Sequence, residues 1–209
     1  PGLGLKISGL IVPLAGGHPF ATVLYSALAV WMLGLAVPVT ASYIIAAVMV
    51  APALVQAGVP DVAAHMFIFY YAVLSEVSPP TALSPFAAAA LTGGNPFKTM
   101  MLTWKYTLPA FVVPFAFTLA PAGEGILLRG SLSGIATATL SAAAGIAILA
   151  ASFGGWIRGP LTRLERGLAA AAGVLLCYAD LRADMSGFVL ISVVLVLHFG
   201  RRPTQVSGK

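Results

Sequence analysis

The chain has 209 residues, of which 59% are hydrophobic and only 8% are charged, and its mean hydropathy is +0.98. This apolar content exceeds that of soluble globular domains and predicts a polytopic membrane protein. The net charge is +5, but the basic residues stand at the ends of apolar segments and form no stripe, which argues against nucleic-acid binding. The single cysteine, Cys177, excludes a disulfide framework and a cysteine-based metal site.

An all-α fold follows from the apolar runs, which are long and rich in Ala and Leu. A bilayer core of about 30 Å needs roughly 20 helical residues, and an open sheet leaves backbone groups unpaired in lipid. The alternating ten-residue pattern of an outer-membrane barrel is absent. The chain begins with Pro1 rather than Met and has no signal-peptide pattern, so we expect a fragment of a longer protein.

The first apolar segment, residues 7–33, is interrupted by turn-forming residues at 15–19, and a second break with Gly34 and Pro38 extends over residues 33–43. The apolar run 44–55 follows. Residues 20–33 are short for a full span, and no charge follows them. The pattern predicts a helical hairpin over about 20–57, either re-entrant with its tip at mid-depth or built from two ordinary spans.

A discontinuous membrane helix is predicted over about 61–92, because a polar island interrupts it near its middle. The island is the sequence Ser75-Glu76-Val77-Ser78-Pro79-Pro80-Thr81. Hydroxyls, a carboxylate and two prolines are costly at this depth in lipid. Each flank therefore has the pattern of half a transmembrane helix.

The rest of the chain contains an amphipathic segment at 97–106, a span at 107–121, and apolar segments at 132–153, 167–179 and 186–199. The last two are short and predict a terminal hairpin around residues 180–184. We expect two parts, 1–130 and 131–209, the second with about three membrane helices.

Loop charge predicts the orientation. On this layout one side holds Lys98, Lys105, Arg158, Arg163, Arg166, Arg201, Arg202 and Lys209, and the other holds Lys6, Arg129 and Arg182. The positive-inside rule makes the first side, and with it the C-terminus, cytoplasmic.

Two consecutive broken segments are typical of secondary transporters, which bind substrate and ions where helices unwind. Free carbonyls and hydroxyls at such breaks suit a hard cation such as Na⁺. We expect Na⁺ at Thr40, Ser78 and Thr81 with nearby carbonyls. The candidate ion and substrate residues are Gly34, Pro38, Thr40, Ser42, Ser75, Glu76, Ser78, Pro79, Pro80 and Thr81.

Glu76 is the most informative single residue, since a charge inside a membrane marks a pathway, a relay or an ion pair. It stands at the C-terminal end of a half-helix, where the dipole disfavours an anion. Ion coupling, a structural pair and a water-exposed position near the tip all remain open for it. For Thr40, Ser78 and Thr81, ligand binding and hydrogen bonding to their own helix are equally open, whereas Ser84 favours the latter.

An intramembrane enzyme is the competing class, with Ser75 or Ser78 activated by Glu76. No histidine or lysine accompanies these serines, and neither a Gly-x-Ser-x-Gly elbow nor a His-Glu-x-x-His motif occurs. We therefore expect a transporter without a cofactor. A secondary carrier without a binding protein, and a membrane scaffold subunit, stay open as further alternatives.

The chain resembles the large membrane subunit of tripartite ATP-independent periplasmic (TRAP) transporters, in the TAXI-type fused-permease branch. The residues that carry the resemblance are 33–44, 51–54, 64–83 and 105–115. It covers roughly residues 1–130, and 131–209 resemble the extra C-terminal helices of that branch more loosely.

The resemblance implies half of an inverted-repeat, elevator-type transporter in the inner membrane of a prokaryote, importing a small organic anion by Na⁺ or H⁺ symport. It also implies a TAXI-type extracytoplasmic solute-binding protein and a small membrane subunit, fused in a missing N-terminal part, as partners. The two breaks would then form one cation site and half of the substrate site.

Two positions depart from the family pattern. Ala36 stands where the family often has a second Gly, and Glu76 where many relatives have a neutral residue. Proton-linked or cation-specific coupling through Glu76 is therefore a hypothesis about this chain alone.

Overall fold

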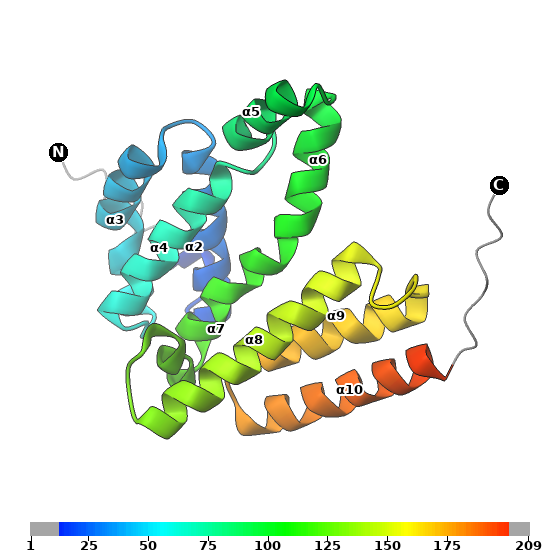
Figure 1. The fold of residues 1–209 in the computed structure, drawn as a ribbon. Coiled ribbons are helices and arrows are strands. Elements are labelled where there is room, and N and C mark those ends of the chain that lie inside the picture. The colour runs from blue at the N-terminus through cyan, green and yellow to red at the C-terminus, as the bar shows by residue number, and fades with distance from the viewer. Residues whose placement is uncertain (1–12, 201–209) are drawn as a thin grey trace.

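The computed structural model of the protein describes residues 13–200, which are helical and contain no β-strand, as Figure 1 shows. Besides the helices, one isolated bridge joins Trp156 and Pro160. The all-α prediction is therefore confirmed. The elements are α2 (Pro19–Gly34), α3 (Val39–Gln56), α4 (Asp61–Ser75), α5 (Leu83–Thr92), α6 (Pro96–Thr107), η1 (Leu108–Val112), α7 (Val113–Leu119), η2 (Pro121–Leu127), α8 (Leu132–Gly154), α9 (Arg163–Cys177) and α10 (Leu181–Phe199).

Within the described residues, α3, α8 and α10 are long and apolar enough to cross a membrane. Helices α2, α4 and α5 are apolar but shorter. The predicted start of the first apolar segment at residue 7, and the end charges Lys6, Arg201, Arg202 and Lys209, lie outside the described residues.

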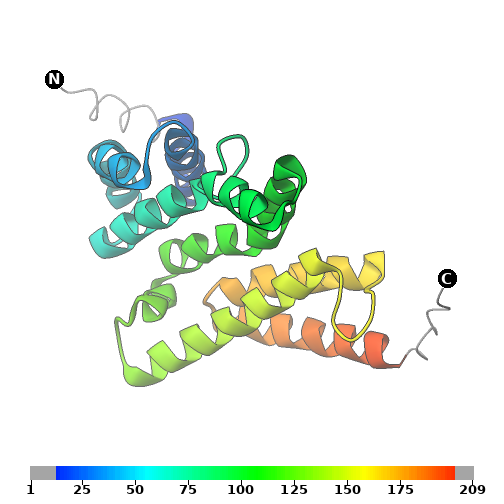
Figure 2. The same cartoon turned by 45° about the horizontal axis from the view of Figure 1, so that its top comes forward.

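The N-terminal bundle consists of α2, α3 and α4, with α7 packed against them (Figures 1 and 2). Small residues such as Ala53, Ala64 and Ala72 are fully buried there and let the helices approach closely, around larger side chains such as Leu54 and Phe67. Close packing of this kind supplies most of the attraction between helices in lipid.

A nearly continuous rod of α6, η1 and α7 connects the bundle to the C-terminal helices (Figure 1). The predicted span at 107–121 therefore begins as a tighter helical turn, since Pro109 and Pro114 lack the amide N–H that a regular α-helix requires. The Tyr71 hydroxyl donates to the Phe111 carbonyl at 2.7 Å and ties α4 to η1.

The C-terminal module consists of α8, α9 and α10, which run side by side beneath the bundle in Figure 2. Helices α8 and α9 cross at glycines: a Cβ added at Gly173 would lie 2.8 Å from the Gly145 carbonyl oxygen. Ala116, Leu149 and Cys177 form a small buried cluster that joins this module to α7.

Three predicted boundaries were displaced, in each case because a residue near the expected loop starts a helix. Helix α3 begins directly after Pro38, so the first break is shorter than residues 33–43. Helix α9 begins at Arg163, where Thr162 and Glu165 form a capping box. Helix α10 begins at Leu181, because the Asp180 side chain accepts from the Arg182 and Ala183 amides.

Candidate functional site

The two helix breaks meet at one pocket of about 200 Å³. The first break, between α2 and α3, and the second, between α4 and α5, supply its walls. The lining residues are Gly34, Leu35, Ala36, Val37 and Pro38 from the first, and Glu76, Thr81 and Leu83 from the second. Segments about forty residues apart in the sequence thus share one concave surface.

Gly34 allows this close approach. A Cβ at this position would lie 2.7 Å from the Ser75 Cβ, closer still to the Ser75 hydroxyl, and 3.3 Å from the Ser42 hydroxyl. Real Cβ atoms do not approach a neighbour to that degree. A side chain at position 34 would therefore push the end of α2 away from α4.

The first break leaves backbone carbonyls without partners. The Leu35 amide donates to the Trp31 and Met32 carbonyls, the Ala36 amide donates to Leu33, and the Ser42 amide donates to Pro38. The carbonyls between Leu33 and Pro38 accept no backbone hydrogen bond from residues 13–200. These oxygens are available to a ligand or to water.

At the second break, two backbone amides donate to carbonyls within the same segment. The Ser78 amide donates to the Ser75 carbonyl at 3.0 Å, and the Ala82 amide donates to Ser78 at 3.1 Å. The carbonyls of Glu76 and Val77 accept no backbone hydrogen bond within the described part of the chain. The Pro79–Pro80 peptide bond is cis.

The buried hydroxyls at the junction differ in their hydrogen bonds. Ser75 donates to the Ala72 carbonyl at 2.6 Å and Ser78 to the Leu74 carbonyl at 2.8 Å, so both bond to their own helix. Each still has oxygen lone pairs that can coordinate a cation. Ser42 is fully buried, and its Oγ has no hydrogen-bond partner among the described residues.

The other predicted site residues are more open. Thr81 and Pro80 are exposed and Pro79 is half-buried, and of these three only Thr81 lines the pocket. Thr40 is exposed in the first turn of α3 and does not line it. The structure therefore brings Gly34, Pro38, Glu76 and Thr81 to the pocket, with Ser42 and Ser75 against Gly34 behind it.

The pocket has electrostatically distinct walls. Helices α2 and α4 end at it, so the negative ends of their dipoles approach the half-buried Glu76. Helices α3 and α5 begin at it, after Pro38 and Ala82, and no side chain caps their first amides. Two walls thus favour a cation and two favour an anion, and no Lys, Arg or His lines the pocket.

A cation at this pocket would have mainly neutral oxygen ligands. Among the described residues, no group of three or more His, Cys, Asp or Glu side chains is placed to hold a metal ion. Backbone carbonyls, hydroxyls and one carboxylate form a donor set that suits a hard ion such as Na⁺ rather than a transition metal.

Sequence reasoning did not single out Leu35, Val37 and Leu83, which also line the pocket. These residues contribute backbone atoms and apolar surface to the pocket wall, so their side-chain types do not indicate a binding site. Only their positions could have indicated them, because each lies within one or two residues of a Gly, a Pro or a Thr that marks the break.

Apolar helices, paired helix breaks and a pocket between them are the features expected of a membrane-embedded transport protein. The family model of the tripartite ATP-independent periplasmic transporter, DctM component, matches residues 1–122, more than half of the chain. The chain therefore belongs to the DctM family of TRAP transporter membrane components. Comparisons with curated proteins and with solved structures gave no match.

Membership of the DctM family establishes the general function of the chain. The chain is a membrane component of a TRAP secondary transporter, and such components work with a periplasmic solute-binding protein. The family match ends at residue 122, so α8, α9 and α10 lie outside it.

Proposed function

We propose that the chain forms the C-terminal half of a TAXI-type TRAP permease that imports a small organic anion, a carboxylate, by Na⁺ or H⁺ symport. Its partners would be a TAXI-type solute-binding protein and a small membrane subunit fused to the N-terminal half. The observation that carries the proposal is the single pocket that both helix breaks line.

The cation would bind on the side of the pocket where α2 and α4 end. Residues of the first break whose carbonyls accept no backbone hydrogen bond line this pocket together with Glu76, and they would supply its oxygen ligands. The buried Ser42 hydroxyl supports this location, because a buried hydroxyl without a hydrogen bond costs about 1–3 kcal/mol and requires an explanation. A cation within reach of Ser42 Oγ would supply one.

The substrate carboxylate would bind on the side where α3 and α5 begin. Their first amides have no side-chain cap, and discontinuous helices in transporters direct such N-termini at anionic substrate groups. Without a basic residue in the lining, the bound cation would offset part of the negative charge of the substrate and Glu76. This arrangement couples the two ligands, since each favours binding of the other.

The proposed location is the inner membrane of a prokaryote with the C-terminus in the cytoplasm. The support is loop charge: Lys98, Lys105, Arg158, Arg163 and Arg166 stand on the predicted cytoplasmic side. The short amphipathic helix α6, with Trp104 and Lys105 near its end, suits a membrane interface.

The direct test is uptake into liposomes that contain the full-length permease, with purified binding protein and labelled carboxylate supplied outside. We expect uptake only with the binding protein present and only under an inward Na⁺ or H⁺ gradient. Uptake that persists without any cation gradient would disprove symport, and uptake without the binding protein would indicate another kind of secondary carrier.

A further inference from the structure

One end of the C-terminal module carries three exposed arginines. Arg158 lies in the loop after α8, and Arg163 and Arg166 lie in the first turns of α9. The end of α10 meets them, since Arg158 lies over the Phe199 ring at 5.9 Å. The opposite end of α10 begins with Asp180, Arg182 and Asp184, so the two ends of the module differ in charge.

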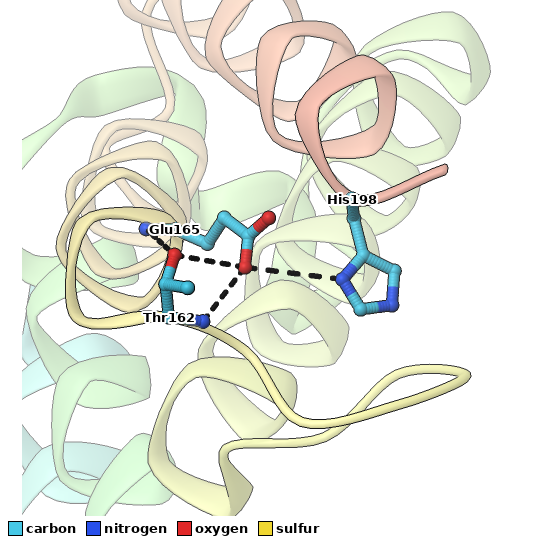
Figure 3. A network of polar contacts seen from close by, with 3 residues as sticks. All are labelled: Thr162, Glu165 and His198. Atoms are coloured by element: carbon cyan, nitrogen blue, oxygen red, sulfur yellow. Dashed lines mark hydrogen bonds and ion pairs between the residues drawn. The ribbon is translucent and has the colours of Figure 1, made fainter. Parts of the chain in front are cut away.

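The acidic residue at the arginine end is turned inward. Glu165 is fully buried and accepts hydrogen bonds from the Thr162 amide at 2.7 Å and the Thr162 hydroxyl at 3.0 Å. Its Oε2 also lies 3.9 Å from His198 Nδ1, as Figure 3 shows. This carboxylate stabilises the start of α9 and contributes little negative charge at the surface.

The arginines consequently keep most of their hydrogen-bonding capacity. Within residues 13–200, none of the three lies within ion-pair distance of a carboxylate. Arg166 donates one bond, from Nε to the Ser152 carbonyl at 2.9 Å, which leaves its terminal nitrogens free of protein partners in that range. A guanidinium has five N–H donors in a fork that matches the oxygens of a phosphate.

Exposed apolar side chains lie among these charges. Trp156 is 58% exposed in the α8–α9 loop, and Leu164 is 65% exposed between Arg163 and Glu165. Helices α8 and α10, which end here, are both long and apolar enough to cross a membrane. Trp, Leu and Arg together at the end of such helices are the composition of a membrane interface.

We propose that this end of the module, defined by Trp156, Arg158, Arg163, Leu164 and Arg166, binds the headgroups of anionic phospholipids. The arginines would bind the phosphate groups, while Trp156 and Leu164 contact the glycerol and upper acyl region. Basic pockets beside membrane helices recognise anionic lipids in this way. The exposed apolar residues favour a lipid over a soluble anion, which would gain nothing from them. The proposal does not depend on transport.

The test is lipid selection by the full-length permease purified in mild detergent and mixed with equal amounts of phosphatidylglycerol and phosphatidylcholine. Lipid retained after size-exclusion chromatography is counted by mass spectrometry. We expect the wild type to retain phosphatidylglycerol in excess and Arg158→Gln/Arg163→Gln to lower that excess by about fivefold per arginine. Arg158→Lys/Arg163→Lys should restore most of it, and high salt should weaken it in the wild type.

The matched control is Arg129→Gln/Arg182→Gln, which removes the same charge outside this end and should leave the excess within about twofold of the wild-type value. The proposal is overturned if the wild type shows no preference, if the two double variants behave alike, or if millimolar glycerol phosphate abolishes the preference. The first result would leave the arginines as topology signals, and the last would indicate a site for a free phosphate ester. Should Arg158→Gln/Arg163→Gln fail to fold, the salt dependence of the wild type and the lysine variant decide the question.

Discussion

The N-terminal bundle and the C-terminal module use helix ends in opposite ways. In the module, α8, α9 and α10 each begin with a side-chain cap, from Ser131, Thr162 and Asp180. In the bundle, α2, α3 and α4 begin without one, and so does α5, which follows α4. The first amides of the module's helices are thus bonded within the chain, whereas at the pocket the first amides of α3 and α5 have no side-chain cap. Carbonyls of the first break also accept no backbone hydrogen bond within the described residues.

Buried serines show the same contrast. The single Ser141 O–H is shared between the Leu176 carbonyl, 3.1 Å away, and the Asp184 carboxylate, and this contact joins all three helices of the module. Ser42, equally buried in the bundle, has no partner among the described residues. Polar groups in the module stabilise it, while those at the pocket remain available for binding.

The largest expected effect comes from Gly34→Ala. The added Cβ would overlap Ser75 at the junction of the two breaks, and overpacking of this kind costs about 1–3 kcal/mol. We expect binding-protein-dependent uptake in liposomes to fall by about tenfold or more. Gly167→Ala is the matched control, because a Cβ there meets nothing within 4 Å, and its uptake should equal that of the wild type. Equal uptake by both variants would show that transport does not require the close approach of α2 to Ser75 at Gly34.

A smaller effect is expected on the free energy of unfolding, and it differs between Ser141 and Ser42. Ser141→Ala leaves a carbonyl and a carboxylate without their hydrogen bonds and should lower the free energy of unfolding by about 2 kcal/mol. Ser42→Ala removes a buried hydroxyl without a partner, so it should leave the free energy of unfolding unchanged or raise it by at most about 1–3 kcal/mol. Thermal unfolding in detergent measures both. A large loss of stability in Ser42→Ala would mean that Ser42 has a structural role.

Much of this fold was predictable from the sequence. Gly34 with Pro38, and the polar island around Pro79 and Pro80, indicate both breaks, because these residues cannot continue a helix in lipid at low cost. The helix starts at Arg163 and Leu181 were missed, although Thr162 and Asp180 are typical capping residues. The charged residues near these positions indicated loops, but the capping side chains place the helix starts there.

The site was predictable only in part. Glu76 is an unusual residue type for a membrane segment and Thr81 follows two prolines, and both line the pocket. Thr40 has the same hydroxyl as Thr81 but does not line the pocket, because its position in the first turn of α3 depends on where that helix resumes after Pro38. The walls formed by Leu35, Val37 and Leu83 depend on tertiary contact between the breaks, which no local pattern encodes.

The central claim is that the two breaks form one cation site, and a double-mutant cycle tests it most directly. Ser42→Ala, Glu76→Gln and the double variant are compared by the apparent cation affinity of uptake in liposomes. A shared cation predicts non-additive losses, with an interaction energy of about 1 kcal/mol or more. Losses that add to within about 0.3–0.5 kcal/mol, or an unchanged cation dependence and pH profile in Glu76→Gln, would contradict a joint site.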